Sequence, residues 1–111
     1  MQKTYSTFTD FWPFYLREHS RPLTRGLHYL GTSTAVAIFG YAFMIGSWGW
    51  LVLLPIAGYG LAWVAHFFVE KNKPATFIYP AWSLIADFKM WWLWLTGDLK
   101  IELEKAGVPE S

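Results

Sequence analysis

The feature that most constrains this chain is a long uncharged stretch, residues 26–69, which contains no Asp, Glu, Lys or Arg. A turn signal at residues 46–49 (GSWG) divides the stretch into segments 27–45 and 50–69. Each segment has about the 20 residues that a membrane-spanning helix needs. The two segments therefore predict a transmembrane helical hairpin. The alternative is a pair of core helices in a soluble bundle, which is disfavoured because neither segment has a polar side to face water.

Composition agrees with a membrane protein of one domain, residues 1–111. Aromatic residues make up 21% of the chain, and eight of them are tryptophans. A soluble domain of this length has too small a core to bury so many aromatic rings, whereas a bilayer accommodates them. The formal net charge of +1 gives no sign of a nucleic-acid partner. The absence of cysteine excludes disulfides, thiolate metal sites and a cysteine nucleophile.

The segments on either side of the hairpin predict further helices. Residues 8–19 form a short aromatic-rich pattern that suits an interfacial helix lying on the membrane. Residues 81–95 predict an interfacial or partly inserted helix with a belt of tryptophans, and residues 98–106 predict one or two polar helical turns. The expected fold class is therefore all-α integral membrane, with the hairpin flanked by an N-terminal interfacial helix and a C-terminal aromatic-rich helix.

Basic residues predict the orientation of the hairpin. Arg17, Arg21 and Arg25 precede the first span, Lys71 and Lys73 follow the second, and the turn between the spans has no basic residue. The positive-inside rule therefore places the N-terminus and both outer ends of the hairpin in the cytoplasm. The expected localisation is that of a multi-pass membrane protein.

All three histidines of the chain are predicted to meet at one membrane face. His19 precedes the hairpin, His28 lies in the first turn of the first span, and His66 lies in the last turn of the second. A hairpin brings these two helix ends together. Small residues, which let membrane helices approach closely, share the stripes of His28 and His66. They are Thr32 and Ala35 on the first span, and Gly58 and Ala62 on the second.

A carboxylate joins this layer at helical spacing, because Glu70 stands four residues after His66. The candidate catalytic and metal-ligating residues are therefore His19, His28, His66 and Glu70. Imidazole and carboxylate without thiolate suit iron(II), manganese or zinc. Two other functions stay open at this point. One is a haem protein with His28 and His66 as axial ligands; the other is a non-enzymatic lipid-binding or scaffold protein, with the histidines as separate interfacial residues.

Four further residues are candidates for binding a substrate. Arg21 or Arg25 could hold a carboxylate, although both also serve as orientation charges. Asp87 lies four residues after Ser83 and either faces the same site or is solvated. Asn72 is the fourth candidate, although its position also suits a residue that shapes the loop.

Two segments resemble the signatures of a known membrane family. The first is residues 18–32 (EHSRPLTRGLHYLGT), and the second is residues 66–77 (HFFVEKNKPATF). The second signature continues through Tyr79, Pro80, Ser83, Asp87 and Met90. The family is that of the yeast 2-hydroxy fatty acid dioxygenase, long catalogued as a domain of unknown function. The resemblance covers about residues 10–98.

The resemblance implies an iron(II)-dependent dioxygenase of fatty acid α-oxidation, which converts a 2-hydroxy fatty acid to the acid one carbon shorter plus carbon dioxide. His19, His28 and His66 match the motif histidines of the family, and Glu70 matches its motif acid. The chain is much shorter than the yeast enzyme and looks like a short bacterial form, which implies the bacterial inner membrane. The expected partners are the lipid bilayer, a 2-hydroxy fatty acid or related lipid, dioxygen and a second copy of the chain.

Overall fold

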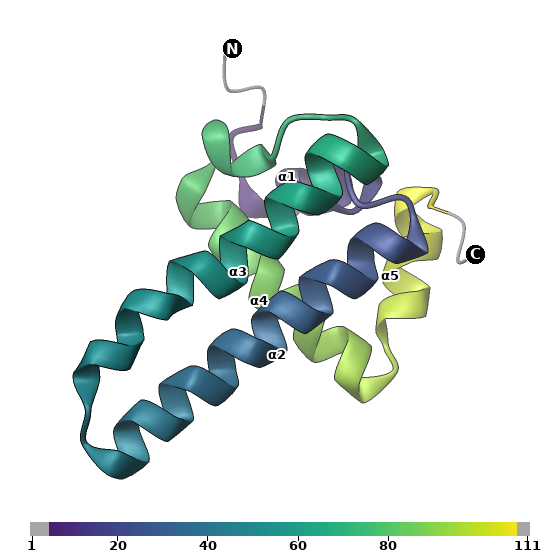
Figure 1. The fold of residues 1–111 in the computed structure, drawn as a ribbon. Helices are drawn as coiled ribbons and strands as arrows, with labels where there is room; N and C mark the ends of the chain where they lie inside the picture. The colour runs from purple at the N-terminus through teal and green to yellow at the C-terminus, as the bar shows by residue number, and fades with distance from the viewer. Residues whose placement is uncertain (1–4, 109–111) are drawn as a thin grey trace.

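The structure is a computed structural model that describes residues 5–108, so the two ends of the expected single domain, 1–4 and 109–111, lie outside the described residues. Every regular element between residues 5 and 108 is helical, which confirms the all-helical fold class (Figure 1). The α-helices are α1 (Phe8–Arg17), α2 (Pro22–Ile45), α3 (Leu53–Val64), α4 (Pro80–Thr96) and α5 (Leu99–Ala106). Two 3-10 helices, η1 (Trp48–Val52) and η3 (Ala75–Phe77), and one π-helix, η2 (Ala65–Glu70), connect them.

α2 and α3 run side by side in opposite directions and project from the rest of the molecule as a two-helix arm (Figure 1). α2 begins at Pro22 rather than at residue 27, because a proline fits the first helical turn, where its missing N–H is not needed. The helix ends at Ile45 and is followed by Gly46, whose φ of +67° is in the left-handed region that glycine adopts without strain. The chain then reverses through η1 into α3.

The close approach of α2 and α3 depends on Gly31. A Cβ atom at this position would lie 3.0 Å from the carbonyl oxygen of Ala57 and 3.3 Å from that of Gly58. The expected role of small residues in the packing therefore falls on a glycine beside the predicted stripe. Thr32 and Ala35, which are on that stripe, instead line a cavity between the two helices.

At the other end of the molecule, the broad end, α1 packs against α4 and α5 to form a helical core. Phe11, Trp12, Tyr15 and Leu16 of α1 are buried there. The Trp12 indole N–H also donates a hydrogen bond of 2.9 Å to Glu102 Oε1 of α5. The aromatic side of α1 therefore packs into the protein core, whereas the sequence predicted that it would lie on a lipid surface.

Within the described residues, one helical run is long and apolar enough to cross a membrane, Trp48–Glu70, with 23 residues. It comprises η1, α3 and η2 and contains the second predicted span, 50–69. α2 is one residue longer, with 24 residues, but His28, Thr32 and Ser33 lower the hydropathy of its first half. Length and composition therefore support a single candidate span.

Candidate metal centre

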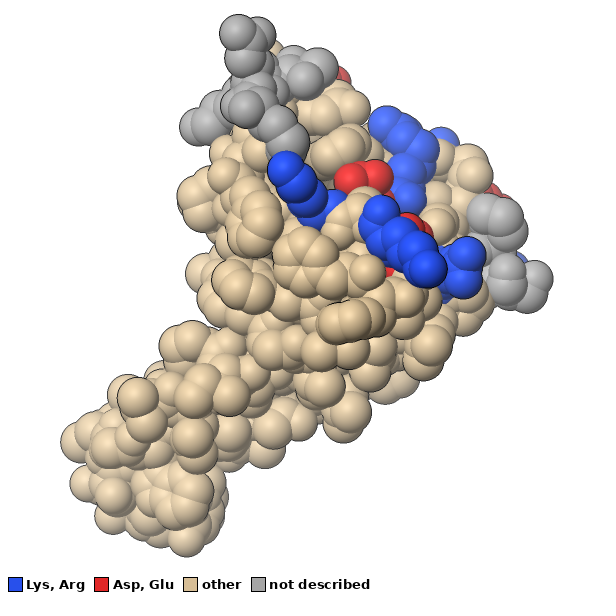
Figure 2. Space-filling view, turned by 45° about the horizontal axis from the view of Figure 1, so that its top comes forward, with Lys and Arg blue, Asp and Glu red and all other residues tan. Residues whose placement is uncertain are grey.

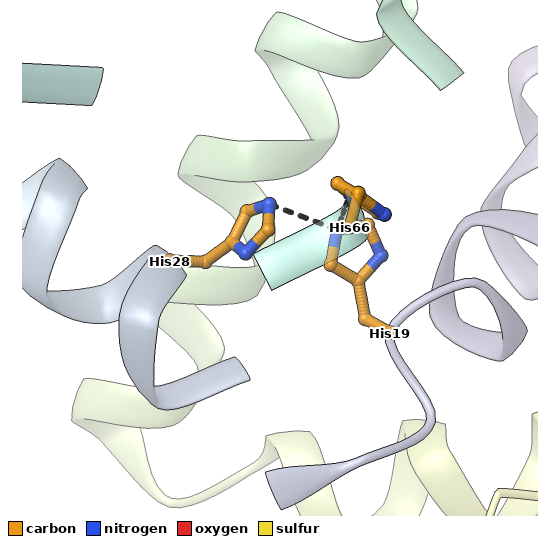
Figure 3. A group of neighbouring side chains, drawn as sticks. All are labelled: His19, His28 and His66. Carbon is orange, nitrogen blue, oxygen red and sulfur yellow. Dashed lines mark hydrogen bonds between the residues drawn. The ribbon is translucent and has the colours of Figure 1, made fainter. Parts of the chain in front are cut away.

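Three buried histidines meet where the arm joins the broad end. His19 lies in the loop between α1 and α2, His28 in α2, and His66 in η2 (Figure 3). The Nε2 atom of His19 is 3.0 Å from that of His28 and 3.1 Å from that of His66. One ligand atom from each of the three residues lies within 4.8 Å of the others. Their exposed fractions are 1%, 5% and 2%, so the cluster is closed to bulk solvent.

The second ring nitrogen of each histidine is held by an oxygen acceptor. His19 Nδ1 donates to the backbone oxygen of Tyr15 at 2.7 Å, and His28 Nδ1 donates to that of Thr24 at 3.0 Å. His66 Nδ1 donates to Asn72 Oδ1 at 2.7 Å. The orientation of the Asn72 amide follows from its Nδ2, which donates to the backbone oxygen of Glu18 at 3.2 Å.

These hydrogen bonds determine which ring nitrogen of each histidine carries the proton. A neutral imidazole whose Nδ1 carries the proton presents a lone pair at Nε2. Burial, followed by the neighbouring His28 and His66, holds the pKa of His19 well below its usual range, so this ring is neutral. Three lone pairs that point at one another repel unless a cation lies between them. This donor set, with its Nδ1 atoms held by outer oxygens, is the arrangement of histidines that bind a metal ion.

Polar side chains of α1 and α4 share a small cavity with the histidines. A small cavity of about 10 Å³, room for about one water-sized sphere, is lined by the three histidines and by Tyr15, Ser83 and Asp87. The Tyr15 hydroxyl donates a hydrogen bond to Asp87 Oδ1. Burial raises the pKa of the Asp87 carboxyl to about 7, against the opposing effect of the bond from Tyr15.

A comparison of sequences identifies the family. A sequence profile of the family described as 2-hydroxy-palmitic acid dioxygenase Mpo1-like matches residues 5–99, which is most of the chain. The chain belongs to this Mpo1-like family. The resemblance carried by the two signatures is thereby confirmed. Comparisons with curated proteins and with solved structures gave no match.

Glu70, the predicted acid of the Mpo1-like second signature, is held outside the histidine cluster. Its carboxylate accepts bonds of 2.7 Å from the Ser20 hydroxyl, the Arg21 backbone N–H and the Thr24 hydroxyl. It therefore caps the start of α2, where backbone N–H groups favour an anion. A role for Glu70 as a metal ligand stays a prediction.

The predicted substrate-binding residues lie in different places. The Arg25 guanidinium is buried and its Nη1 donates to the backbone oxygens of His19 and Ser20, at 2.8 and 3.0 Å, so it fixes the loop that carries His19. Arg21 is exposed at the start of α2. Asn72 orients His66, as described above. Of the four, only Asp87 lines the cavity beside the histidines.

Tyr15 is a site residue that sequence reasoning missed. Its ring packs against His19 with 4.2 Å between ring centroids, and its hydroxyl bonds to Asp87. The available signal was its position four residues before His19, which places both on one side of a helix that continues to the loop. The surrounding aromatic residues of α1 obscured that signal.

Proposed function

We propose that this chain is an iron(II)-dependent dioxygenase of fatty acid α-oxidation. The observation that carries the proposal is the meeting of three buried imidazole Nε2 atoms, each on a ring whose Nδ1 is held by an oxygen acceptor. Imidazole nitrogen suits iron among other metals, and the family's description names a dioxygenase. Bound iron(II) would be held by His19, His28 and His66 and would supply the one-electron chemistry that dioxygen requires.

The overall reaction balances without a second reductant. A 2-hydroxy fatty acid and one dioxygen give the acid one carbon shorter, carbon dioxide and water. The bond between C1 and C2 breaks, C1 leaves as carbon dioxide, and C2 is oxidised from an alcohol to a carboxylic acid. Carbon loses four electrons, and these reduce both atoms of dioxygen.

An apolar crevice next to the histidines supports a lipid substrate. It has a volume of about 440 Å³ and runs between α2, α3 and α4, a size within the usual range of ligand pockets. His28 and Asp87 lie among its lining residues, and Phe39 and Leu54 line it further along the arm. From His28 to Phe39 the crevice extends about 16 Å along α2, as the helical rise requires. An acyl chain would occupy the crevice while its polar end meets the histidines.

Three features support insertion of the arm into a membrane as a transmembrane hairpin. Only 17% of the most apolar 18-residue segment of Trp48–Glu70 is buried, whereas the core helix of a soluble protein would be mostly buried. Apolar side chains such as Met44 and Val52 are exposed at the far end of the arm, at 84% and 69%. On the face shown in Figure 2, Lys and Arg gather on the broad end and are absent from the arm.

This charge distribution supports a cytoplasmic position for the histidine site, by the positive-inside rule. In a bacterial cell the membrane would be the inner membrane. The lipid bilayer, a 2-hydroxy fatty acid and dioxygen are then the partners of the chain, and a homo-oligomer stays a prediction.

The reaction itself tests the proposal. The chain is purified in mild detergent, loaded anaerobically with iron(II), and given dioxygen and 2-hydroxypalmitic acid, the acid in the family's description. We expect the acid one carbon shorter and carbon dioxide in equal amounts. His66→Ala should abolish the product, and Lys105→Ala, which removes an exposed side chain of α5, serves as the control. The absence of the shorter acid, or full activity of His66→Ala, would overturn the proposal. A Soret band in the purified chain would favour the haem alternative.

A further inference from the structure

One buried polar atom in the histidine cavity has no partner in the protein. Among residues 5–108, Ser83 Oγ is the buried side-chain oxygen or nitrogen atom that makes no hydrogen bond. Ser83 is 2% exposed and lines the same small cavity as His19, His28 and His66. A buried hydroxyl without a partner is destabilising, because it has given up its hydrogen bonds to water without replacing them. Its place in the cavity therefore indicates that a bound molecule supplies the missing partner.

Asp87 lies one helical turn after Ser83 on α4 and stands where two cavities meet. It lines both the small histidine cavity and the apolar crevice. His28 and Tyr59 also line both cavities. The bond from Tyr15 occupies Asp87 Oδ1 and holds the carboxyl in one orientation. The second oxygen of the carboxyl group is therefore available to a ligand whose chain lies in the crevice.

The position of α4 against the arm is fixed by two contacts further along the helix. The Trp91 indole N–H donates to the Ser33 hydroxyl of α2 at 2.9 Å. The Trp94 ring stacks on Tyr29 of α2 with 4.3 Å between centroids. The two polar groups of α4 are thus held at a set place relative to His28.

The charges around the two cavities limit how the polar end of a substrate can be recognised. Among the described residues, no Lys or Arg lines either cavity. In the metal-free chain a substrate carboxylate therefore meets no Lys or Arg side chain in either cavity. Polar recognition then has to come from hydrogen bonds. Besides the histidines, the polar side chains that line the two cavities are Tyr15, Thr32, Tyr59, Thr76, Ser83 and Asp87. Ser83 is the one with a buried oxygen that has no partner, and Asp87 is the one that carries a carboxyl group.

We propose that Ser83 and Asp87 recognise the polar end of the substrate, and that Asp87 selects a 2-hydroxy fatty acid over an unsubstituted one. Asp87 accepts a hydrogen bond from the 2-hydroxyl group, and Ser83 donates one to the neighbouring carboxylate. This inference rests on the proposed function for the nature of the substrate. A site that is built to bond a hydroxyl group rejects an analogue without one, because its own buried polar group is then left unpaired.

Binding without turnover tests this role. The metal-free chain in mild detergent is titrated with 2-hydroxypalmitic acid and with palmitic acid, and tryptophan fluorescence reports the dissociation constants. Metal-free protein is used because a metal ion would itself prefer the acid with two oxygen ligands. We expect the wild-type chain to bind the 2-hydroxy acid about 10- to 100-fold more tightly, as one hydrogen bond to a charged group provides.

Asp87→Asn and Ser83→Ala should each weaken binding of the 2-hydroxy acid. Asp87→Asn should reduce its preference over palmitic acid about tenfold or more, with palmitic acid binding as before. Ser47→Ala, at an exposed serine between α2 and η1 that lines neither cavity, is the matched control and should keep the wild-type ratio. The inference would be overturned if Asp87→Asn kept the wild-type ratio of the two dissociation constants, or if Asp87→Asn lost affinity equally for both acids. Because this assay needs neither metal nor dioxygen, it can fail while the α-oxidation assay succeeds, or the reverse.

Discussion

The broad end of the molecule and the far end of the arm differ in what they bury. At the broad end, polar side chains such as His19, Thr24 and Arg25 are buried with partners, around a core of aromatic residues. At the far end, Ala42 is buried but apolar neighbours such as Phe43 and Met44 are exposed. The histidine site lies between the two regions. A polar histidine site beside an apolar crevice would suit the proposed lipid substrate, which has one polar end.

The difference also explains what each region needs from its surroundings. Among residues 5–108, the buried polar side chains of the broad end have partners within the protein, with the exception of Ser83. The arm presents apolar side chains to the outside, which costs about 25 cal/mol per Å² in water and nothing in lipid. We therefore expect substitutions in the two regions to act on different properties, namely membrane insertion for the arm and metal or substrate binding for the broad end.

The largest expected effect is on membrane insertion. Ile56 is 65% exposed near the middle of Trp48–Glu70, and Ile56→Lys should cost about 3 kcal/mol of insertion free energy because a charge enters the hydrocarbon region. The measurement is the fraction of chain that resists carbonate extraction from membranes. Ile101→Lys, at a 54% exposed position of α5, is the matched control and should extract like the wild type. Equal extraction of both variants would remove the proposed distinction between arm and broad end.

A smaller effect is expected at Asn72, which lies beside the proposed metal site. Asn72→Ala removes the oxygen that holds His66 Nδ1 and should weaken metal binding about 10- to 100-fold, because His66 is no longer oriented. Competition with a chelator of known affinity measures the change. Asn72→Asp keeps an acceptor oxygen and should restore most of the affinity. If Asn72→Ala bound metal as tightly as the wild type, the bond from His66 to Asn72 would not be needed to orient His66 for metal binding.

The smallest expected effect concerns Glu70. Glu70→Gln should lower the thermal stability of the broad end by about 1 kcal/mol, because an amide cannot accept all three bonds at the start of α2. Thermal unfolding in detergent, followed by circular dichroism, measures the change. The number of metal ions bound per chain should stay the same. Loss of the metal in this variant would instead make Glu70 a ligand, as the family signature suggested.

The meeting of the histidines was predictable, whereas their partners were not. A charge-free stretch with a turn in its middle brings His28 and His66 to one end, whatever the details of packing. The environment of Glu70 was not predictable, because its three hydrogen-bond donors lie about 50 positions earlier in the chain, at the start of α2. The hydrogen bonds of Arg25 and Asn72 to the loop around His19 also depend on tertiary contacts, which periodicity does not encode.

The most direct test of the account is the number and kind of ligands around a bound metal ion. The chain is loaded anaerobically with iron(II), freed of excess metal, and studied by metal analysis and X-ray absorption at the iron edge. We predict one iron per chain, with three imidazole nitrogens among its ligands, and loss of the iron in His19→Ala, His28→Ala and His66→Ala. Iron no higher in the wild-type chain than in these variants, or a metal environment without imidazole, would contradict the account.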